Sequence, residues 1–214
     1  MPVLLRLDSS ADLQGSRSRA VTSTFAEAWR SRGPDHTVVA RDLHTEPLPH
    51  LADPALHWPP RLRPEGAAPP ADAERLQTEL VEELLAADVL LIGAPLYNYT
   101  VPSTLKAWLD HVHVPGLTAP FGEPTQPLAG RPAVIVSSRG ASYDAGSPTE
   151  GWDHAVPVLE LLLGTALGMD VSVITTSLTL AESVPALSGQ RERAAAELAA
   201  AHEAAGALAL RLGG

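Results

Sequence analysis

The sequence predicts an α/β fold in which helices cover both faces of one five-stranded parallel sheet. Short apolar runs, typical of buried parallel strands, alternate along the chain with longer segments of helical periodicity. Polar or glycine-containing stretches follow three of these runs, and the ligand-binding loops of open parallel sheets follow their strands in this way. We therefore expect the strand order 2-1-3-4-5 and a single domain over residues 1–214.

The first half of the chain is expected to contain two strands and two helices. Residues 3–7 (VLLRL) form a short apolar strand, which the polar stretch DSSADLQGS ends, and residues 36–42 (HTVVARD) form the second strand. A helix over residues 19–32 has its apolar side chains on one face. Residues 44–72 are dense in proline, so we expect an elaborated connection over the surface. The leucines of residues 73–87 are spaced for one face of the next helix.

The second half continues the alternation. Residues 88–94 are the most strand-like run in the chain, and a helix is expected to follow over residues 103–112. The remaining expected elements are a strand over 131–138, a helix over 152–167, a strand over 171–177 and an alanine-rich helix over 186–212. This pattern places a helix after each of the five strands.

Composition and charge argue against several classes of function. The formal net charge of −10 does not favour nucleic-acid binding, which requires clustered Lys and Arg. The chain has no cysteine, so disulfides, thiolate nucleophiles and thiolate-bound metals are excluded. His111 and His113, two residues apart on one helix, point to different faces and have no third ligand in view, so we expect no metal site. No stretch has the length of a membrane span, and the first apolar run meets Arg6 too early for a signal peptide, so we expect a cytoplasmic protein.

The chemistry is expected in the loops that follow the first, third and fourth strands, near the switch in strand order. These loops cover residues 8–18, 95–102 and 138–151. The chain has three tyrosines, and all of them lie in the second or third loop: Tyr97, Tyr99 and Tyr143. One loop tyrosine is commonly a surface cap, whereas three around one predicted site favour a ligand.

The first loop (SSADLQGSRSR) brings four serines and an arginine to the start of a helix: Ser9, Ser10, Ser16, Arg17 and Ser18. Unpaired amides at a helix N-terminus, hydroxyl donors and a guanidinium suit a terminal phosphate. Capping of the helix by Ser16 or Ser18 explains the same residues without a ligand, and both interpretations stay open. The loop contains neither the G-x-x-x-x-G-K-[ST] nor the G-x-G-x-x-G pattern.

The third loop (SSRGASYDAGSPTEGW) contains Gly140, Gly146 and Gly151. Glycines allow the backbone to approach the edge of a flat ligand and to offer its amides as donors. A plain flexible loop would have a similar composition, so this motif alone does not decide between the two.

Together, the three loops make the chain resemble the FMN-dependent NAD(P)H azoreductases and quinone reductases of the flavodoxin-like superfamily. The resemblance rests on R-L-D-S-S and S-R-S in the first loop, P-L-Y-N-Y before S-T-L-K in the second, and S-S-R-G in the third. R-D-L at residues 41–43, the proline-rich connection and the alanine-rich last helix also match the layout of that family. The resemblance spans almost the whole chain and implies a flavodoxin-like fold.

The resemblance also implies where FMN binds. The first loop would hold its phosphate, the second its isoalloxazine, and the third the pyrimidine edge of the ring. In that order, the implied cofactor-binding residues are Ser10, Ser16, Arg17, Ser18, Leu96, Tyr97, Asn98, Tyr99, Ser138, Arg139, Gly140 and Ala141. Backbone donors at the pyrimidine edge would stabilise negative charge on the reduced ring.

In such enzymes NADH or NADPH reduces the FMN and leaves, and a quinone or azo compound then stacks on the same ring face. This is a ping-pong mechanism in which the flavin carries the chemistry, so no catalytic side chain is expected. The family places its sites at the interface of a homodimer. Phe121 and Tyr143 are the candidates for stacking on an aromatic or quinonoid substrate. For Phe121, anchoring a proline-rich loop is the alternative.

The chain departs from the family pattern in ways that leave other functions open. The third motif reads S-R-G-A where the family usually has a second glycine, Tyr143 stands where many members have histidine, and P-L-Y-N-Y replaces the commoner Met and Phe. A paralogue recruited to a dedicated substrate of specialised metabolism is therefore one alternative. An electron-transfer flavodoxin-like carrier and a protein that has lost FMN are two others. The sequence does not choose between NADH and NADPH.

Overall fold

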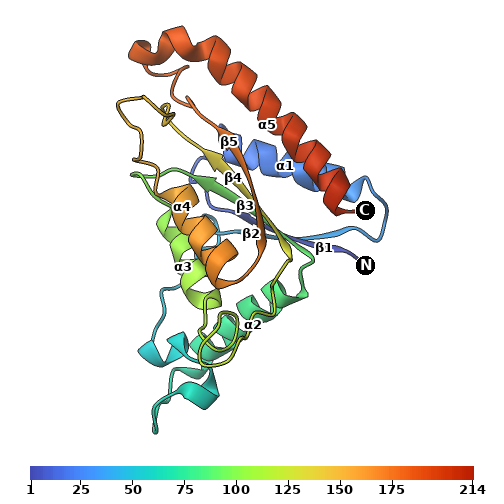
Figure 1. Ribbon diagram of the computed structural model, residues 1–214, viewed down its shortest axis with the longest axis vertical. Coiled ribbons are helices and arrows are strands. Elements are labelled where there is room, and N and C mark those ends of the chain that lie inside the picture. The colour runs from blue at the N-terminus through green and yellow to red at the C-terminus, as the bar shows by residue number, and fades with distance from the viewer.

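The computed structural model describes residues 1–214, and five parallel strands form one sheet at its centre (Figure 1). The strand order is β2-β1-β3-β4-β5, which confirms the prediction. The strands are β1 (Val3–Asp8), β2 (Thr37–Asp42), β3 (Val89–Pro95), β4 (Pro132–Ser138) and β5 (Asp170–Thr176). Because the chain passes from β1 to β2 on one side and then returns to β3 on the other, the loops after β1 and β3 diverge and leave a crevice.

Helices cover both faces of the sheet, as predicted (Figure 1). The α-helices are α1 (Arg17–Arg30), α2 (Ala71–Ala86), α3 (Ser103–Val112), α4 (Ala155–Leu159) and α5 (Arg191–Leu212). Helices α1 and α5 pack side by side on one face, and α2, α3 and α4 lie on the other (Figure 1).

Each face of the sheet has its own hydrophobic core. Successive side chains of a strand point to opposite faces, so Leu4 belongs to the core under α1 and α5, whereas Leu5 belongs to the core under α2, α3 and α4. Trp29 and Trp108 are fully buried, one in each core. Strand β3 is buried along its whole length, which explains why it is the most continuous apolar run in the sequence.

The proline-rich connection contains two short 3₁₀ helices, η1 (Pro54–His57) and η2 (Pro60–Leu62). The carboxylate of Asp53 accepts a hydrogen bond from the amide of Ala55 at 2.8 Å and caps η1. Leu56 is fully buried and anchors the connection to the core. Most other residues of this segment stay half-buried or exposed, as expected for a surface connection.

Helix α1 was predicted to begin at residue 19, but it begins at Arg17. The Ser16 hydroxyl accepts a hydrogen bond from the Arg19 amide at 3.3 Å, and this cap starts the helix one turn before its apolar face begins.

The helix predicted over residues 152–167 begins only at Ala155. The carboxylate of Asp153 accepts hydrogen bonds from the amides of Ala155 and Val156, at 2.9 and 3.2 Å, and so sets this start. From Glu160 to Ala166 the chain continues as a π-helix (η3), a form that apolar periodicity does not distinguish from an α-helix.

The last helix also starts later than the predicted residue 186. Pro185–Gln190 forms a 3₁₀ helix (η4), and α5 follows it from Arg191. None of the helices combines the length and the hydropathy needed to cross a lipid bilayer.

Candidate functional site

A cavity of about 290 Å³ lies at the carboxyl ends of the central strands, where the strand order reverses. The loops after β1, β3 and β4 line it, as predicted, together with a segment after β5. The lining residues are Ser10, Asp12, Gly15, Ser16, Arg17, Pro95, Leu96, Tyr97, Ser138, Thr179, Leu180 and Ser183. Hydroxyl groups therefore dominate its polar lining.

Both ends of the first loop are held by hydrogen bonds. At its start, the amide and the hydroxyl of Ser9 both donate to the carbonyl of Gly93, at 3.2 and 2.7 Å. At its end, the Ser16 hydroxyl caps α1 and lies 3.1 Å from the hydroxyl of the buried Ser18. The first amides of a helix have no partners within the helix, so this loop delivers N–H donors to the cavity.

Asp12 is the one carboxylate that lines the cavity. It accepts hydrogen bonds from the amides of Gly15 and Gln14, at 2.7 and 3.0 Å, and these bonds lower its pKa. The contacts close a short turn over residues 12–15. A Cβ atom at Gly15 would lie 2.8 Å from the Asp12 carboxylate, so a larger residue there would displace this side chain.

Beneath the cavity, the carboxylate of Asp8 is buried at the end of β1. Arg6 Nε lies 2.8 Å from this carboxylate, and the Thr22 hydroxyl donates to it at 2.7 Å. Burial raises the pKa of Asp8, and the charge of Arg6 opposes that shift. These contacts attach α1 to the end of β1 and so fix the position of the helix N-terminus.

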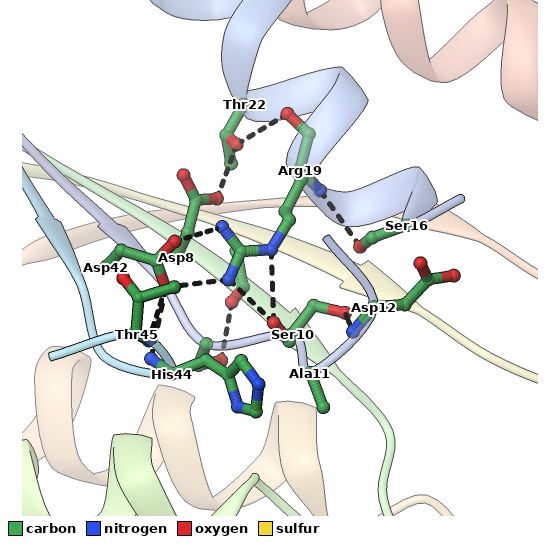
Figure 2. Close-up of polar contacts among 12 residues, drawn as sticks. Asp8, Ser10, Ala11, Asp12, Ser16, Arg19, Thr22, Asp42, His44 and Thr45 are labelled. Atoms are coloured by element: carbon green, nitrogen blue, oxygen red, sulfur yellow. Dashed lines mark hydrogen bonds and ion pairs between the residues drawn. The ribbon is translucent and has the colours of Figure 1, made fainter. Parts of the chain in front are cut away.

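Arg19 joins the first loop to the end of β2 (Figure 2). Its guanidinium donates to both carboxylate oxygens of Asp42, at 2.6 and 2.7 Å, and to the carbonyl of Ser10, at 2.6 and 3.1 Å. The hydrogen bonds from Arg19 lower the pKa of Asp42 to about 2, and the same bonds raise the pKa of Arg19.

The second loop begins with a tight turn. Tyr97 and Thr100 exchange both backbone hydrogen bonds, at 2.9 and 3.1 Å. The residues between them, Asn98 and Tyr99, have φ values of 47° and 69°, as in a type I′ turn. Asparagine tolerates this left-handed conformation, whereas at Tyr99 it costs about 1 kcal/mol. Such strain is characteristic of functional sites.

The third loop is attached to the second by polar and aromatic contacts. Arg139 pairs with Asp153 at 2.8 Å, and both side chains are mostly buried. The amide of His154 donates to the carbonyl of Tyr99 at 2.9 Å. The ring of Tyr99 packs edge-on against Trp152, with a centroid distance of 5.4 Å.

Tyr143 lies half-buried near the same residues. Burial raises the pKa of its hydroxyl, and the nearby Tyr99 and Asp153 raise it further, so Tyr143 is neutral at physiological pH. Tyr143 does not line the cavity itself, and its predicted role in substrate stacking stays a prediction.

Residues 177–183, after β5, form a fourth wall that was not predicted from the sequence. The amides of Thr179 and Leu180 donate to the carbonyls of Arg139 and Gly140, at 2.9 and 3.2 Å. A Cβ atom at Gly140 would lie 2.9 Å from the side chain of Leu180, so glycine allows this contact. The segment SLTLAES has no glycine, tyrosine or phosphate-binding pattern. The one signal for it was its position at the carboxyl end of a parallel strand.

The structure brings half of the twelve predicted cofactor-binding residues into the cavity: Ser10, Ser16, Arg17, Leu96, Tyr97 and Ser138. Ser18 lies buried next to Ser16, and Asn98 lines a neighbouring cavity of about 490 Å³ that Tyr97 also borders. The remaining four do not line the cavity: Tyr99, Arg139, Gly140 and Ala141.

Two predicted side chains have neighbours that the sequence did not indicate. The guanidinium of Arg17 donates to the carbonyls of Ser177 and Ala194, at 3.1 and 3.2 Å, and so holds the segment after β5. Phe121 packs edge-on against Trp58 of the proline-rich connection, at 4.8 Å. Within one chain this contact matches the anchoring alternative for Phe121.

The residues at the cavity fit the phosphate and the ring of FMN. Amides at the start of α1, the hydroxyls of Ser10 and Ser16, and the remaining N–H groups of Arg17 are the donors that a terminal phosphate requires. Leu96 and Tyr97 add an apolar and an aromatic surface beside them. The structure contains no group of three or more His, Asp or Glu side chains suited to a metal ion.

The fold and the site define a flavodoxin-like protein, with a five-stranded sheet in the order 2-1-3-4-5 and a polar cavity at the order switch. A family model described as the flavodoxin-like fold matches residues 3–207, and the chain belongs to that family.

Within it, the chain is similar to proteins named FMN-dependent NADH:quinone oxidoreductase. It is 64% identical to one from Kineococcus radiotolerans over 212 residues, which cover 99% of this chain and 100% of the relative. It is 42% identical to one from Streptomyces avermitilis over 222 residues, which cover 99% of this chain and 97% of the relative. The chain therefore belongs to the family that the sequence motifs indicated.

Solved structures support the fold. An azoreductase from Bacillus anthracis strain Sterne superposes with a TM-score of 0.81 at 20% identity, over 99% of this chain and 100% of the other. An FMN-dependent NADH-azoreductase from Bacillus anthracis strain Ames Ancestor, in complex with FMN, superposes with a TM-score of 0.77 at 20% identity, over 98% and 100% of the two chains.

Proposed function

We propose that the protein is an FMN-dependent oxidoreductase that takes hydride from NADH or NADPH and reduces quinones or azo compounds. The observation that carries this proposal is the 64% identity, over nearly the full length of both chains, to a protein named FMN-dependent NADH:quinone oxidoreductase. The polar cavity at the predicted loops supports it. In this proposal residues 1–214 form a single FMN-binding domain. The protein works in the cytoplasm, where the nicotinamide reductant is produced.

Bound FMN supplies both the hydride acceptor and the hydride donor of the reaction. The chain's part is to bind and orient it. The first loop would hold the phosphate through Ser10, Ser16 and the amides at the start of α1. Tyr97 and the strained turn after it would position the ring, and the third loop would offer backbone donors to the pyrimidine edge. We add Thr179 and Ser183 to the residues expected to contact the cofactor, because they line the same cavity.

The enzymatic role is tested by mixing the FMN-loaded protein with NADH or NADPH in a stopped-flow instrument. We expect the flavin absorbance to bleach and to recover when a simple quinone or azo dye is added. Steady-state rates at several quinone concentrations should give parallel double-reciprocal plots, because the two substrates use one ring face in turn.

Three outcomes separate the alternatives. A flavin that dithionite bleaches but neither nicotinamide does would contradict the enzyme and favour an electron carrier. Bleaching by NADH that no quinone or azo dye reverses would favour a dedicated substrate. A colourless protein that does not bind added FMN would show that the cofactor has been lost.

We also propose that the protein is a homodimer with the site at the subunit interface. Large apolar side chains stand exposed on the loops around the site and on η3: Tyr99, Trp152 and Leu161 have exposed fractions of 47%, 48% and 58%. A second copy would bury them. In such a dimer Phe121 and Tyr143 are the candidates for contact with an aromatic substrate.

Light scattering coupled to size exclusion tests the assembly. We expect a mass of twice the 22.5 kDa of the chain, and a Trp152→Asp variant should shift the protein toward the monomer. A monomer in the wild-type protein at micromolar concentration would contradict the proposal.

A further inference from the structure

We propose that Arg19 and Asp42 are positioning residues that hold the Ser10–Ala11 peptide, and through it Tyr97, at the cofactor site. Neither Arg19 nor Asp42 lines the cavity, so neither was a candidate ligand. The inference rests on the proposed function, because it assigns these residues a role in binding FMN.

The guanidinium of Arg19 is committed to protein partners (Figure 2). Nη1 and Nη2 donate to the two carboxylate oxygens of Asp42 at 2.6 and 2.7 Å, which is a bidentate pair. Nε and Nη2 donate to the carbonyl of Ser10 at 3.1 and 2.6 Å. All three nitrogens thus have protein partners, two of them in the first loop, and the side chain points at the peptide and not into the cavity.

The acidic end of this contact makes further hydrogen bonds. Asp42 ends β2, and its carboxylate also accepts hydrogen bonds from the amides of His44 and Thr45, at 3.1 and 3.3 Å. The neighbouring amide of Leu43 donates to the carbonyl of Asp8 at 2.8 Å, which ties the same turn to β1. The carboxylate therefore has one orientation from which to bind Arg19.

The basic end is held by its own backbone. The carbonyl of Arg19 accepts hydrogen bonds from the Thr22 hydroxyl at 3.0 Å and from Nη2 of Arg6 at 3.3 Å. Its amide donates to the Ser16 hydroxyl. Because both ends are fixed, the guanidinium presents its N–H groups to Ser10 in a single geometry.

The other side of the Ser10–Ala11 peptide faces the second loop. The Ala11 amide donates to the Tyr97 hydroxyl at 3.0 Å, and the Ser10 hydroxyl lies 3.3 Å from the same oxygen. One peptide group therefore accepts from a cation through its carbonyl and donates to Tyr97 through its amide. Hydrogen bonds in such a chain polarise one another, so Arg19 strengthens the contact that orients Tyr97.

A general loss of stability is the competing explanation, and the chain offers a matched control for it. Arg41, next to Asp42 on β2, points to the other face of the sheet and pairs with Glu83 of α2 at 2.5 Å. Arg41 also pairs with Glu79 of α2, so Glu83→Gln removes one of its two ion pairs without touching the first loop. It is expected to leave FMN affinity unchanged.

A double-mutant cycle on the apoprotein tests the proposal, with FMN affinity measured from quenching of flavin fluorescence. We expect Arg19→Met to weaken FMN binding about tenfold in the wild-type background, because hydrogen bonds from a charged donor are lost. In the Tyr97→Phe background the same change should weaken binding less than about threefold, because the relayed contact is already absent. Equal losses in both backgrounds would overturn the proposal, and so would an equal loss in Glu83→Gln.

A second measurement does not depend on the cofactor. In the apoprotein, the Ala11 amide should exchange its hydrogen faster in Arg19→Met and in the isosteric Asp42→Asn, and at the wild-type rate in Glu83→Gln. An unchanged rate in the first two variants would overturn the proposal. If Arg19→Met does not fold, Asp42→Asn carries both measurements. If the wild-type apoprotein does not bind FMN, the proposed function fails, and the exchange rate still decides on the role of Arg19.

Discussion

Gly93 makes room for the buried carboxylate of Asp8 at the carboxyl end of β1. A Cβ atom at this position would lie 2.8 Å from the Asp8 carboxylate and 3.3 Å from the methyl group of Thr22. The carbonyl of Gly93 also accepts both hydrogen bonds of Ser9. A residue in the middle of an apolar strand thereby controls the start of the first loop.

We predict that Gly93→Ala lowers the free energy of unfolding by about 1–3 kcal/mol, because the added methyl group overpacks a rigid site. Urea unfolding followed by circular dichroism measures the change. Gly206→Ala is the matched control, since no atom lies within 4 Å of its Cβ position in α5. That change should stabilise the protein by roughly 0.5–1 kcal/mol, as expected for alanine in a helix. Stabilisation by both changes would show that the Asp8 site relaxes freely.

At the scale of elements, Asp153 connects the start of α4 to the third loop. Its carboxylate caps two amides of α4 and pairs with Arg139 at 2.8 Å. We predict that Asp153→Ala lowers the free energy of unfolding by about 2–3 kcal/mol, because a cap is lost and a mostly buried guanidinium is left without its partner.

Asp144→Asn is the control for that prediction, because it breaks an exposed ion pair with Arg193 near the same loop. Exposed pairs contribute little, so we expect a change below roughly 0.5 kcal/mol in the same urea titration. Equal losses of unfolding free energy in the two variants would contradict both the cap at α4 and the contribution of burial to the Arg139–Asp153 pair.

The elements differ in how well the sequence predicts them, and the reason is physical. The strands were predicted closely because each is a short apolar run between polar or proline-containing stretches. Helix starts were predicted less well, because a cap such as Asp153 lies outside the apolar periodicity. Half of the predicted cofactor residues line the cavity, yet the wall around Leu180 was missed, because its contact with Gly140 is made in space and leaves no motif.

At the scale of the whole molecule, ionisation of Asp8 and ionisation of Asp42 change the free energy of unfolding in opposite directions. Burial raises the pKa of Asp8, so the folded protein binds a proton there more readily than the unfolded chain, and acid favours folding at that site. Arg19 lowers the pKa of Asp42 from 3.8 to about 2, so its contribution is present above pH 3.8 and is lost as the pH falls toward 2. Unfolding by acid therefore depends on these individual carboxylates and not only on the formal net charge, which is −10 at pH 7.

We predict that the difference in unfolding free energy between the wild-type protein and Asp42→Asn depends on pH. At neutral pH the wild type is more stable, because Asp42 is ionised and bound to both Arg19 and the turn amides. As the pH falls from 3.8 to about 2, Asp42 takes up a proton and the difference should shrink toward zero. Urea titrations at a series of pH values measure it, and Asp35→Asn, at an exposed position, should match the wild type throughout. A difference that stays constant over this pH range would mean that the charge of Asp42 does not stabilise the fold. The position of Arg19 would then not depend on that charge.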